Sequence, residues 1–538
     1  MTRPLHELSR AESSLDLPTQ PRRDGELKQT WIYRQLRDRV LAGTLAAGTR
    51  LPSTRDLAAR WRVSRATVAL AYDQLRSEGY LVSRAGSGTF IAAVVPDTLT
   101  TARGPRRAGT SATLPGSASM SATASTSTPI AERATRATSG IRALGANEAM
   151  TPAVPMTELG RPFVARVADA ALFPMDAWRK ALADAVRGAS AHDLTHGDAM
   201  GAASLRAEIA KYLGLSRGIA CHADQVLVLS GIRHGLALCG RQLLTGRETV
   251  AVEDPSYLHA EPLLARYAKR VVRVPIDAQG LRVDALSAAG DVRLVHVTPA
   301  HQSPTGVTMP VSRRLALLRW AADGDRWIVE DDYDSEFSYD SAPLPALKSL
   351  DRADRVIHCG SFNKTMFGEL RIGYAVLPDA LVPSFREARH LTGRANGVIE
   401  QLALASFLAS GAFARHLRRS RLVYARRRDV VIAALQRALG AGRLHVTGAQ
   451  AGFHLVWWPP PGFDVARLRE LADAAGLVLP WISRMTSRSD LPDGAMLGYT
   501  GLGDDAVRAH ADTLAQLIER TLGESPGRAR SAKRRPRA

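Results

Sequence analysis

A lysine that follows an apolar run is the first candidate for covalent chemistry. Arg355–His358 has the composition of a short β-strand, and the turn Gly360-Ser361-Phe362-Asn363-Lys364 comes almost directly after it. A lysine on such a turn can form a Schiff base with an aldehyde cofactor when its surroundings lower the pKa of the amine. Most lysines are solvated surface residues, so the neighbouring chemistry has to decide between these two interpretations.

A dense group of carboxylates follows a second apolar run, Trp327–Val329. The group lies within Glu330-Asp331-Asp332-Tyr333-Asp334-Ser335-Glu336. Its oxygens could bind a metal ion. Alternatively, one carboxylate could keep the pyridine nitrogen of pyridoxal 5'-phosphate (PLP) protonated, so that the ring withdraws electrons, while a phenol two residues later bonds the ring O3'. We favour the PLP site, with a metal site and purely structural caps as the other interpretations.

A candidate phosphate cradle follows a third apolar run, Gln225–Leu229. Ser230, Gly231 and Ile232 come next and open an apolar helix. The backbone N–H groups at the start of a helix point toward an anion placed there. These three residues are therefore predicted to bind a phosphate, although a plain strand-to-helix turn would have the same pattern.

The histidines and cysteines give little support to a metal site. His192 and His196 are four residues apart, a spacing that can place two imidazoles on one helical face, but the residues between them lead into a Gly-Asp turn. Cys221, Cys239 and Cys359 are too scattered for a disulfide framework or a CxxC motif. We therefore expect no bound metal and three reduced, structural cysteines.

These candidate residues need a common scaffold, and the pattern from residue 158 to residue 522 supplies one. Short β-branched runs alternate with longer helical patterns, which is typical of βαβ units on a mostly parallel sheet. Ligands of open α/β sheets bind beyond the carboxyl ends of the strands, and polar chemistry follows each run at once. The predicted strands are Gln225–Leu229, Thr249–Val252, Arg293–Val297, Trp327–Val329 and Arg355–His358.

A smaller module precedes this one, at residues 26–93. Trp31, Leu36 and Val40–Leu41 indicate an amphipathic helix, Ser53 is a predicted N-cap of a second helix, and Val63-Ser64 opens a third. Two short helices across a tight turn form a helix-turn-helix. The runs on either side of the Gly-rich segment 83–88 predict a two-stranded hairpin, so the module is predicted to be a winged helix.

Several side chains of this module suit DNA. Arg65 and Thr67 lie near the start of the third helix on its polar face, where a recognition helix meets base edges in the major groove. Ser53 and Arg55 are better placed for backbone phosphates. A small helical domain that binds protein through its charged faces is the alternative. The predicted DNA-binding residues are Ser53, Arg55, Ser64, Arg65, Thr67, Gly86 and Gly88.

The composition of the 538-residue chain agrees with two domains and a polyanionic partner. The formal net charge of +19 favours phosphates, and a hydrophobic content of 45% allows a large core. Residues 94–157 are rich in Ser, Thr, Ala, Gly and Pro and predict a flexible linker, and residues 523–538 predict a disordered basic tail. Because no apolar run approaches the length of a membrane span or a signal peptide, we expect a cytoplasmic protein.

Two parts of the chain resemble known families. Leu51–Ile91 resembles the winged-helix domain of GntR-type transcriptional regulators through LPS-x-R-x-L, V-S-R-x-T-V, L-x-x-x-G-Y and G-S-G-T-F. His296–Pro378 resembles the MocR subfamily of these regulators through T-P-x-H-Q-x-P-T-G-V-T-M, E-D-D-Y-D-S-E-F and L-R-I-G-Y. The resemblance implies a winged helix-turn-helix joined by a long linker to an α/β, PLP-binding domain similar to fold-type I aminotransferases.

The same resemblance implies roles for single residues in the larger domain. Ser230, Gly231 and Ile232 keep their predicted place at the phosphate. The implied roles are Lys364 for the Schiff base, Asp331 for the pyridine nitrogen, Tyr333 for O3', Tyr257 for stacking on the ring, Ser361 and Arg371 for the phosphate, and Arg484 for a ligand carboxylate.

Three positions depart from the family pattern. Relatives usually have S-G-A-Q-Q-A-L where this chain has Ser230–Leu236, T-F-S-K where it has Ser361–Lys364, and Y-G-D-P-x-G where it has His196–Gly201. The loss of a glutamine and of a serine, the latter replaced by Asn363, alters two expected phosphate contacts. Either Arg233 compensates by its charge, or PLP binds weakly. The third departure predicts a different effector pocket.

Three functions remain to be compared. We favour a regulator that binds operator DNA and senses an amine-type ligand or PLP. The family resemblance also implies a head-to-tail homodimer in which each winged helix crosses to the partner's large domain. The alternative is an active aminotransferase with an attached DNA-binding module. Both need Lys364 and Asp331, and they differ in turnover. An architectural basic protein would leave the predicted PLP residues unexplained.

Overall fold

The computed structural model describes residues 21–22, 28–41, 45, 49–77, 81–84, 88–91, 162–339, 345–393 and 396–524. The predicted linker at 94–157 and residues 525–538 of the predicted tail lie outside these ranges, so the predicted domain boundaries stay predictions. None of the helices within the ranges is long and apolar enough to cross a bilayer.

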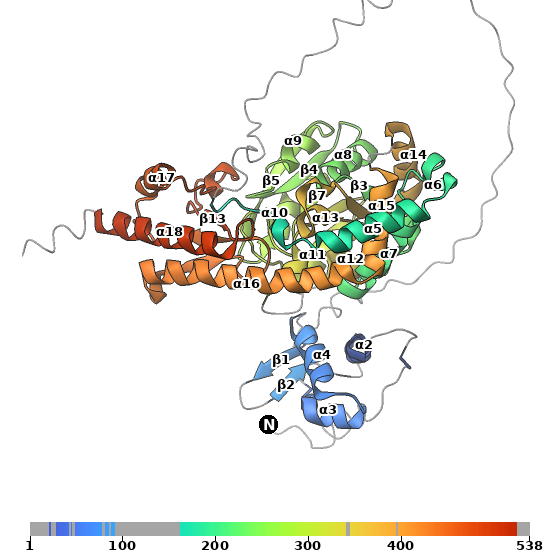
Figure 1. Ribbon diagram of the computed structural model, residues 1–538, viewed down its shortest axis with the longest axis horizontal. Helices are drawn as coiled ribbons and strands as arrows, with labels where there is room; N and C mark the ends of the chain where they lie inside the picture. The colour runs from blue at the N-terminus through green and yellow to red at the C-terminus, as the bar shows by residue number, and fades with distance from the viewer. Residues whose placement is uncertain are drawn as a thin grey trace, which may run out of the picture.

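The N-terminal unit is a winged helix, drawn in blue in Figure 1. The predicted helical faces are buried, because Leu57 and Val68 are both 0% exposed and pack with Trp31 in one core. Leu81 pairs with Ile91 at the start of the antiparallel hairpin, which confirms the predicted wing strands. Its elements are α2 (Lys28–Leu41), α3 (Thr54–Arg60), α4 (Arg65–Ser77), β1 (Leu81–Arg84) and β2 (Gly88–Ile91).

The larger unit is built on a mixed sheet of eight strands in the order β3-β10-β9-β8-β7-β4-β5-β6. β4, β5, β7, β8 and β9 are parallel, while β10 and β6 run antiparallel to their neighbours. The strands are β3 (Val226–Leu229), β4 (Thr249–Asp254), β5 (Arg270–Asp277), β6 (Gly280–Leu281), β7 (Val292–Val297), β8 (Trp327–Asp332), β9 (Val356–Ser361) and β10 (Gly373–Val376).

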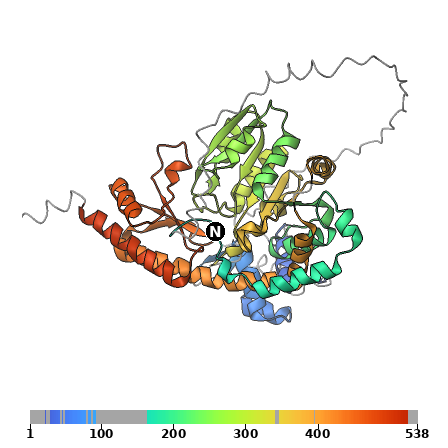
Figure 2. The same cartoon turned by 45° about the horizontal axis from the view of Figure 1, so that its top comes forward.

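Helices cover both faces of this sheet (Figures 1 and 2). Successive residues of a strand point to opposite faces, so Val329 packs with α8, α9 and α14 whereas Ile328 packs with α10 and α11. These helices are α8 (Ile232–Leu243), α9 (Ala260–Leu264), α10 (Val283–Ala288), α11 (Val311–Ala322) and α14 (Val382–Thr392). Further helices are α5 (Met175–Gly188), α6 (Ala191–Thr195), α7 (Ala203–Ser216), α12 (Leu347–Leu350), α13 (Phe362–Thr365) and α15 (Val398–Ala409).

A second, smaller sheet follows toward the C-terminus. It consists of β11 (His445–Thr447), β12 (His454–Trp458) and β13 (Ala495–Gly498), all antiparallel. The long helices α16 (Ala412–Leu439) and α18 (Asp504–Glu524) run side by side, as the orange and red ribbons of Figure 1 show, and α17 (Val465–Ala474) packs on α18.

All five predicted strands are present, but their ends differ from the prediction. Gln225 belongs to a short 3-10 helix rather than to β3. β4, β8 and β9 continue past the predicted ends to Asp254, Asp332 and Ser361. The polar residues remain in the strands because buried partners compensate their charges, as His358 does for Glu330 at 2.9 Å. The candidate residues therefore lie on strands as well as beyond them.

Candidate functional site

Lys364 lies on α13, one turn after the carboxyl end of β9. Its Nζ donates a hydrogen bond of 2.7 Å to the backbone oxygen of Arg166, which is 198 residues earlier in the chain. Burial lowers the pKa of this amine from 10.5 to about 8, and the positive charge of Arg166 adds to the effect. Near neutral pH a substantial fraction of the amine is thus unprotonated and able to act as a nucleophile.

Asp331 and Tyr333 lie beside this lysine at the end of the neighbouring strand β8. Asp331 is in register with Cys359 of β9 and is 6% exposed, and its Oδ2 lies 3.5 Å from Nε2 of His296. The hydroxyl of Tyr333 lies 3.2 Å from Nδ1 of His301. Burial raises the pKa of Tyr333 well above its ordinary value, so the phenol keeps its proton as a hydrogen-bond donor.

The other carboxylates of the predicted cluster each have a partner of their own. Glu330 lies 2.9 Å from His358, which lowers the pKa of the glutamate to about 2 despite its burial. Asp332 pairs with Arg217 at 2.5 Å. Because alternate residues of β8 face opposite sides, Glu330 and Asp332 point away from the face of Asp331. No group of three potential ligands within the described ranges is arranged to hold a metal ion.

The histidine pair of the sequence analysis has a defined arrangement. His192 lies on α6, His196 caps this helix at its C-terminal end, and their rings stack with centroids 5.4 Å apart. The Gly-Asp turn follows the helix rather than interrupting it, so both imidazoles lie on one side of α6 as the spacing allows.

Tyr257 and Arg484 are brought to one region by the chain that follows β4. Tyr257 is partly buried, with its ring 6.5 Å from that of His296. Ser256 donates its N–H to the oxygen of Met485 at 3.2 Å, which holds the segment containing Arg484 next to Tyr257. The side chain of Arg484 is exposed. Among the described residues, no hydrogen bond or ion pair joins it to the other candidate residues, so its role stays a prediction.

The candidate phosphate residues converge on the turn between β3 and α8. Gly231 precedes α8 with φ +135°, a conformation that favours glycine. Asn363 donates its side-chain N–H to the oxygen of Ser230 at 3.3 Å and accepts the N–H of Ile372 at 2.8 Å. Asn363, which departs from the family pattern, therefore joins the segment of Lys364 to the turn at Ser230 and to the residue before β10.

Two further phosphate candidates flank Asn363. Ser361 caps α13 by accepting the N–H of Asn363 at 3.2 Å. Arg371 is exposed and has a left-handed backbone with φ +54°. Its charge lowers the pKa of Tyr257, which burial nevertheless raises to about 12. Ile232 is the first residue of α8, and its N–H is not needed by the helix.

Sequence reasoning missed two residues of this site. Arg166 lies between Tyr257 and Tyr333, with its guanidinium carbon 5.9 Å from each ring centroid. His301 lies between the hydroxyl of Tyr333 and Oδ2 of Asp334, which is 2.8 Å from its Nδ1. The motif T-P-x-H-Q contains His301 and could have drawn attention to it. Nothing in the local pattern around Arg166 predicts its position.

The predicted DNA-binding residues that the structure describes lie at or next to the starts of α3, α4 and β2. Arg55 and Arg65 are exposed at the starts of α3 and α4. The hydroxyl of Ser53 accepts the N–H of Asp56 at 3.2 Å, which confirms the predicted N-cap. In the same way Ser64 accepts the N–H of Thr67 at 3.0 Å. Gly88 is exposed at the start of β2 with φ +109°, and Gly86 lies outside the described residues.

Family models match both units of the chain. Residues 28–91 match the bacterial regulatory proteins of the gntR family. Residues 167–490 match the aminotransferase class I and II family.

Similar proteins of both kinds are known. A probable rhizopine catabolism regulatory protein, MocR, of Rhizobium meliloti is 35% identical over 90% of this chain and 92% of its own. The pyridoxine biosynthesis transcriptional regulator PdxR of Corynebacterium glutamicum is 34% identical over 89% and 93%. The crystal structure of a kynurenine aminotransferase of Pyrococcus horikoshii is similar with a TM-score of 0.61 and 27% identity, covering 67% of this chain and 91% of that one.

Proposed function

Because the chain belongs to the MocR-type GntR regulators, in which a winged helix is joined to a domain of the aminotransferase class I and II family, we propose that an amine-bearing ligand controls its binding to operator DNA. The gntR-type winged helix makes the protein a DNA-binding transcriptional regulator. Membership of the aminotransferase family implies PLP as the cofactor.

The observation that carries the proposal is the environment of Lys364. A partly buried amine with a pKa of about 8 donates to the backbone oxygen of Arg166, whose guanidinium lies near the rings of Tyr333 and Tyr257. When bound, PLP supplies an aldehyde for this amine and a ring that withdraws electrons. Asp331 would face the ring nitrogen, since its carboxylate is buried at the end of the adjacent strand.

The turn after β3 supports the same cofactor. Ser230 and Gly231 leave the first N–H groups of α8 available for a phosphate. A Cβ at Gly231 would lie 3.3 Å from the side chain of Asn363, so a larger residue would crowd the cradle. Ser361 and Arg371 would add a hydroxyl and a positive charge. Tyr333 would bond O3' and Tyr257 would stack on the ring.

The names of the relatives do not identify which amine is the ligand of this protein. The names of the two regulators refer to rhizopine catabolism and to pyridoxine biosynthesis, which are different processes. The residues around Lys364 support only one class of ligand, an amine that competes with Lys364 for the cofactor. An active aminotransferase remains the second candidate, favoured by the match over residues 167–490. Sensing requires binding alone, whereas turnover also requires the release of a keto product.

Aminotransferase-fold proteins are typically dimeric, and we include a head-to-tail homodimer in the proposal. Each winged helix would lie on the large domain of the partner, which the length of the segment at 94–157 permits. Ligand binding in one large domain would then act on DNA held by the other subunit's winged helix.

The visible absorption spectrum of the full-length protein with PLP tests the cofactor site. We expect a band that borohydride abolishes by reducing the bond to the lysine, that is absent in Lys364→Ala and that is retained in Lys211→Ala, which removes an exposed lysine of α7. A reducible band that persists in Lys364→Ala would refute the assignment of the lysine. Operator binding measured with and without amines then tests regulation, and release of a keto product would favour the enzyme.

A further inference from the structure

The helix α4 of the winged helix carries a large apolar side chain on its outer face. Val68, Ala71 and Tyr72 turn inward and are buried in the core of this unit. Leu70 lies on the other side of the helix and is 52% exposed. Within the described part of the winged helix, no other large apolar side chain is exposed to this degree. Because half of its surface is in contact with water, Leu70 contributes little to the core, and folding does not account for its size.

The first two turns of α4 offer few free polar groups. The hydroxyl of Thr67 lies 2.6 Å from the hydroxyl of Ser64, so the two side chains already share a hydrogen bond. The exposed residues of these turns are Arg65, Ala66 and Leu70. Of these three, Arg65 alone can donate a hydrogen bond from its side chain, whereas the other two present methyl groups. The outer face of α4 therefore combines one cation with an apolar surface.

Leu70 is close enough to the start of α4 to reach base edges. The second helix of a helix-turn-helix enters the major groove with its N-terminal residues against the bases. An α-helix rises 1.5 Å per residue, so Leu70 lies about 7.5 Å beyond Arg65 along the axis, which corresponds to about two base pairs. Leu70 also follows Ala66 by four residues and therefore lies on the same side of the helix.

We propose that Leu70 contacts the C5 methyl group of a thymine in the operator and thereby specifies that base. Thymine is the only one of the four bases that carries a methyl group in the major groove. Contact between this methyl group and the leucine removes apolar surface from water on both molecules, and cytosine offers no such contact. The inference rests on the binding of operator DNA by the gntR-type winged helix and is independent of the ligand proposed for the large domain.

The experiment removes one methyl group of the DNA at a time. The probes are duplexes that the full-length wild-type protein selects from a random-sequence pool, in which each thymidine in turn is replaced by deoxyuridine, which lacks only the C5 methyl group. Fluorescence anisotropy gives the affinity of each duplex for the wild-type protein and for Leu70→Ala. Leu422→Ala, which shortens an exposed leucine of α16, is the control. Leucine and alanine both favour helices, so Leu70→Ala should not lower the thermal denaturation midpoint of the winged helix.

We expect the selected sequences to share a thymine at which deoxyuridine weakens wild-type binding by about fourfold, the effect of exposing one methyl group to water. Leu70→Ala should bind the thymidine and deoxyuridine duplexes almost equally, whereas Leu422→Ala should behave as the wild-type protein does. The dependence of affinity on salt concentration should be the same in all three proteins, because a leucine neutralises no phosphate.

Other outcomes overturn the inference and separate it from the proposed function. If the selected sequences share no thymine, or if no deoxyuridine weakens wild-type binding, the protein reads no methyl group. Equal losses in the wild-type protein and in Leu70→Ala would assign the methyl contact to another residue, such as Ala66. A weaker salt dependence in Leu70→Ala would show that the substitution disturbs phosphate contacts instead. If the wild-type protein selects no common sequence, operator binding itself fails, and the inference fails with it.

Discussion

The reactivity of Lys364 toward PLP should depend on pH in a way that an exposed lysine does not. Only the neutral amine attacks an aldehyde, and the pKa of this amine is about 8 instead of the ordinary 10.5. At pH 7.5 about a quarter of Lys364 is therefore neutral, against about one in a thousand for a free lysine. The rate constant for covalent attachment should gain roughly 200-fold from this difference alone.

The pH dependence can be measured by mixing PLP-free protein with PLP and recording the growth of the absorption band between pH 6.5 and 10. The reaction of Nα-acetyl-lysine with PLP under the same conditions is the control. The protonation of PLP affects both reactions equally, so the two profiles differ only through the pKa of the amine. We expect the protein's profile to have its midpoint near pH 8. The reasoning is refuted if the midpoint coincides with that of the free lysine.

The pH profile of PLP attachment measured in Arg166→Gly tests whether the charge of Arg166 lowers the pKa of Lys364. A nearby cation disfavours the protonated amine, and burial does the same, so both lower the pKa of a lysine. Removing Arg166 withdraws a charge and admits water, and both changes raise the pKa of Lys364. The midpoint should move to higher pH, and the rate at pH 7.5 should fall. A midpoint that moves to lower pH would contradict this account.

Three further substitutions test other parts of the molecule. Arg65→Ala should weaken binding to the operator by about 1–3 kcal/mol with little effect on unrelated DNA, which fluorescence anisotropy on both DNAs can measure; equal losses would make Arg65 a phosphate contact. Ser53→Ala removes the cap that accepts the N–H of Asp56 and should destabilise the winged helix by about 1 kcal/mol, seen as a lower denaturation midpoint of that unit; an unchanged midpoint would show that the cap contributes nothing. Asn363→Ala breaks the bonds to Ser230 and Ile372 and should weaken PLP binding by about tenfold in a spectroscopic titration, and unaltered binding would show that the cradle does not need them.

Local pattern was enough to locate the winged helix and five strands of the large sheet. The run Trp327–Val329 and the neighbouring runs became strands of one sheet, because β-branched and apolar residues between polar turns have few other stable arrangements. The capping hydroxyl of Ser53 and the helical spacing of Val68 likewise depend on residues within a few positions of one another. Interactions between residues so close in the chain can be predicted from the sequence.

The ends of the strands could not be read from the same pattern. Carboxylates such as Glu330 are rare in a buried strand unless they are paired. The partner of Glu330 is His358, which lies 28 residues later and on the next strand. Only the parallel register of β8 and β9 brings the two together, so the sequence pattern placed the end of β8 too early.

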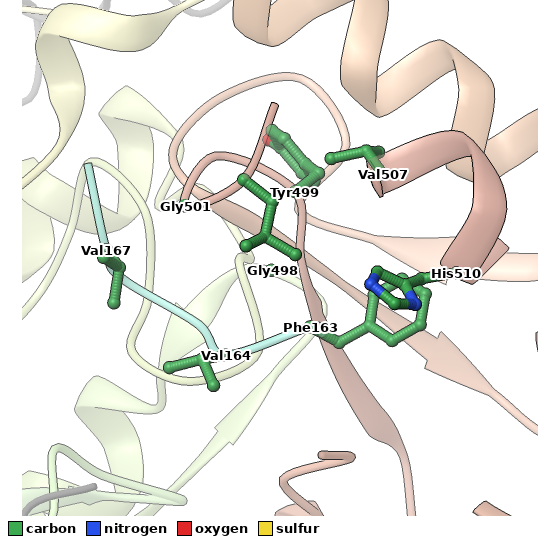
Figure 3. Close-up of a pocket in the computed structure, with 9 residues that line it drawn as sticks. Phe163, Val164, Val167, Gly498, Tyr499, Gly501, Val507 and His510 are labelled. Carbon is green, nitrogen blue, oxygen red and sulfur yellow. The ribbon is translucent and has the colours of Figure 1, made fainter. Parts of the chain in front are cut away.

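The sequence by itself determined the winged helix and five strands of the large sheet, and it predicted Lys364 as the residue that would bind the cofactor. The tertiary structure alone decided the surroundings of that lysine. A hydrogen bond from Gly498, more than 300 residues away, holds the segment of Arg166 in place (Figure 3), and the backbone oxygen of Arg166 accepts the amine of Lys364. The lowered pKa of Lys364 follows from burial and from the charge of Arg166. Both depend on residues distant in the chain, and a periodicity that extends over a few positions contains no information about them.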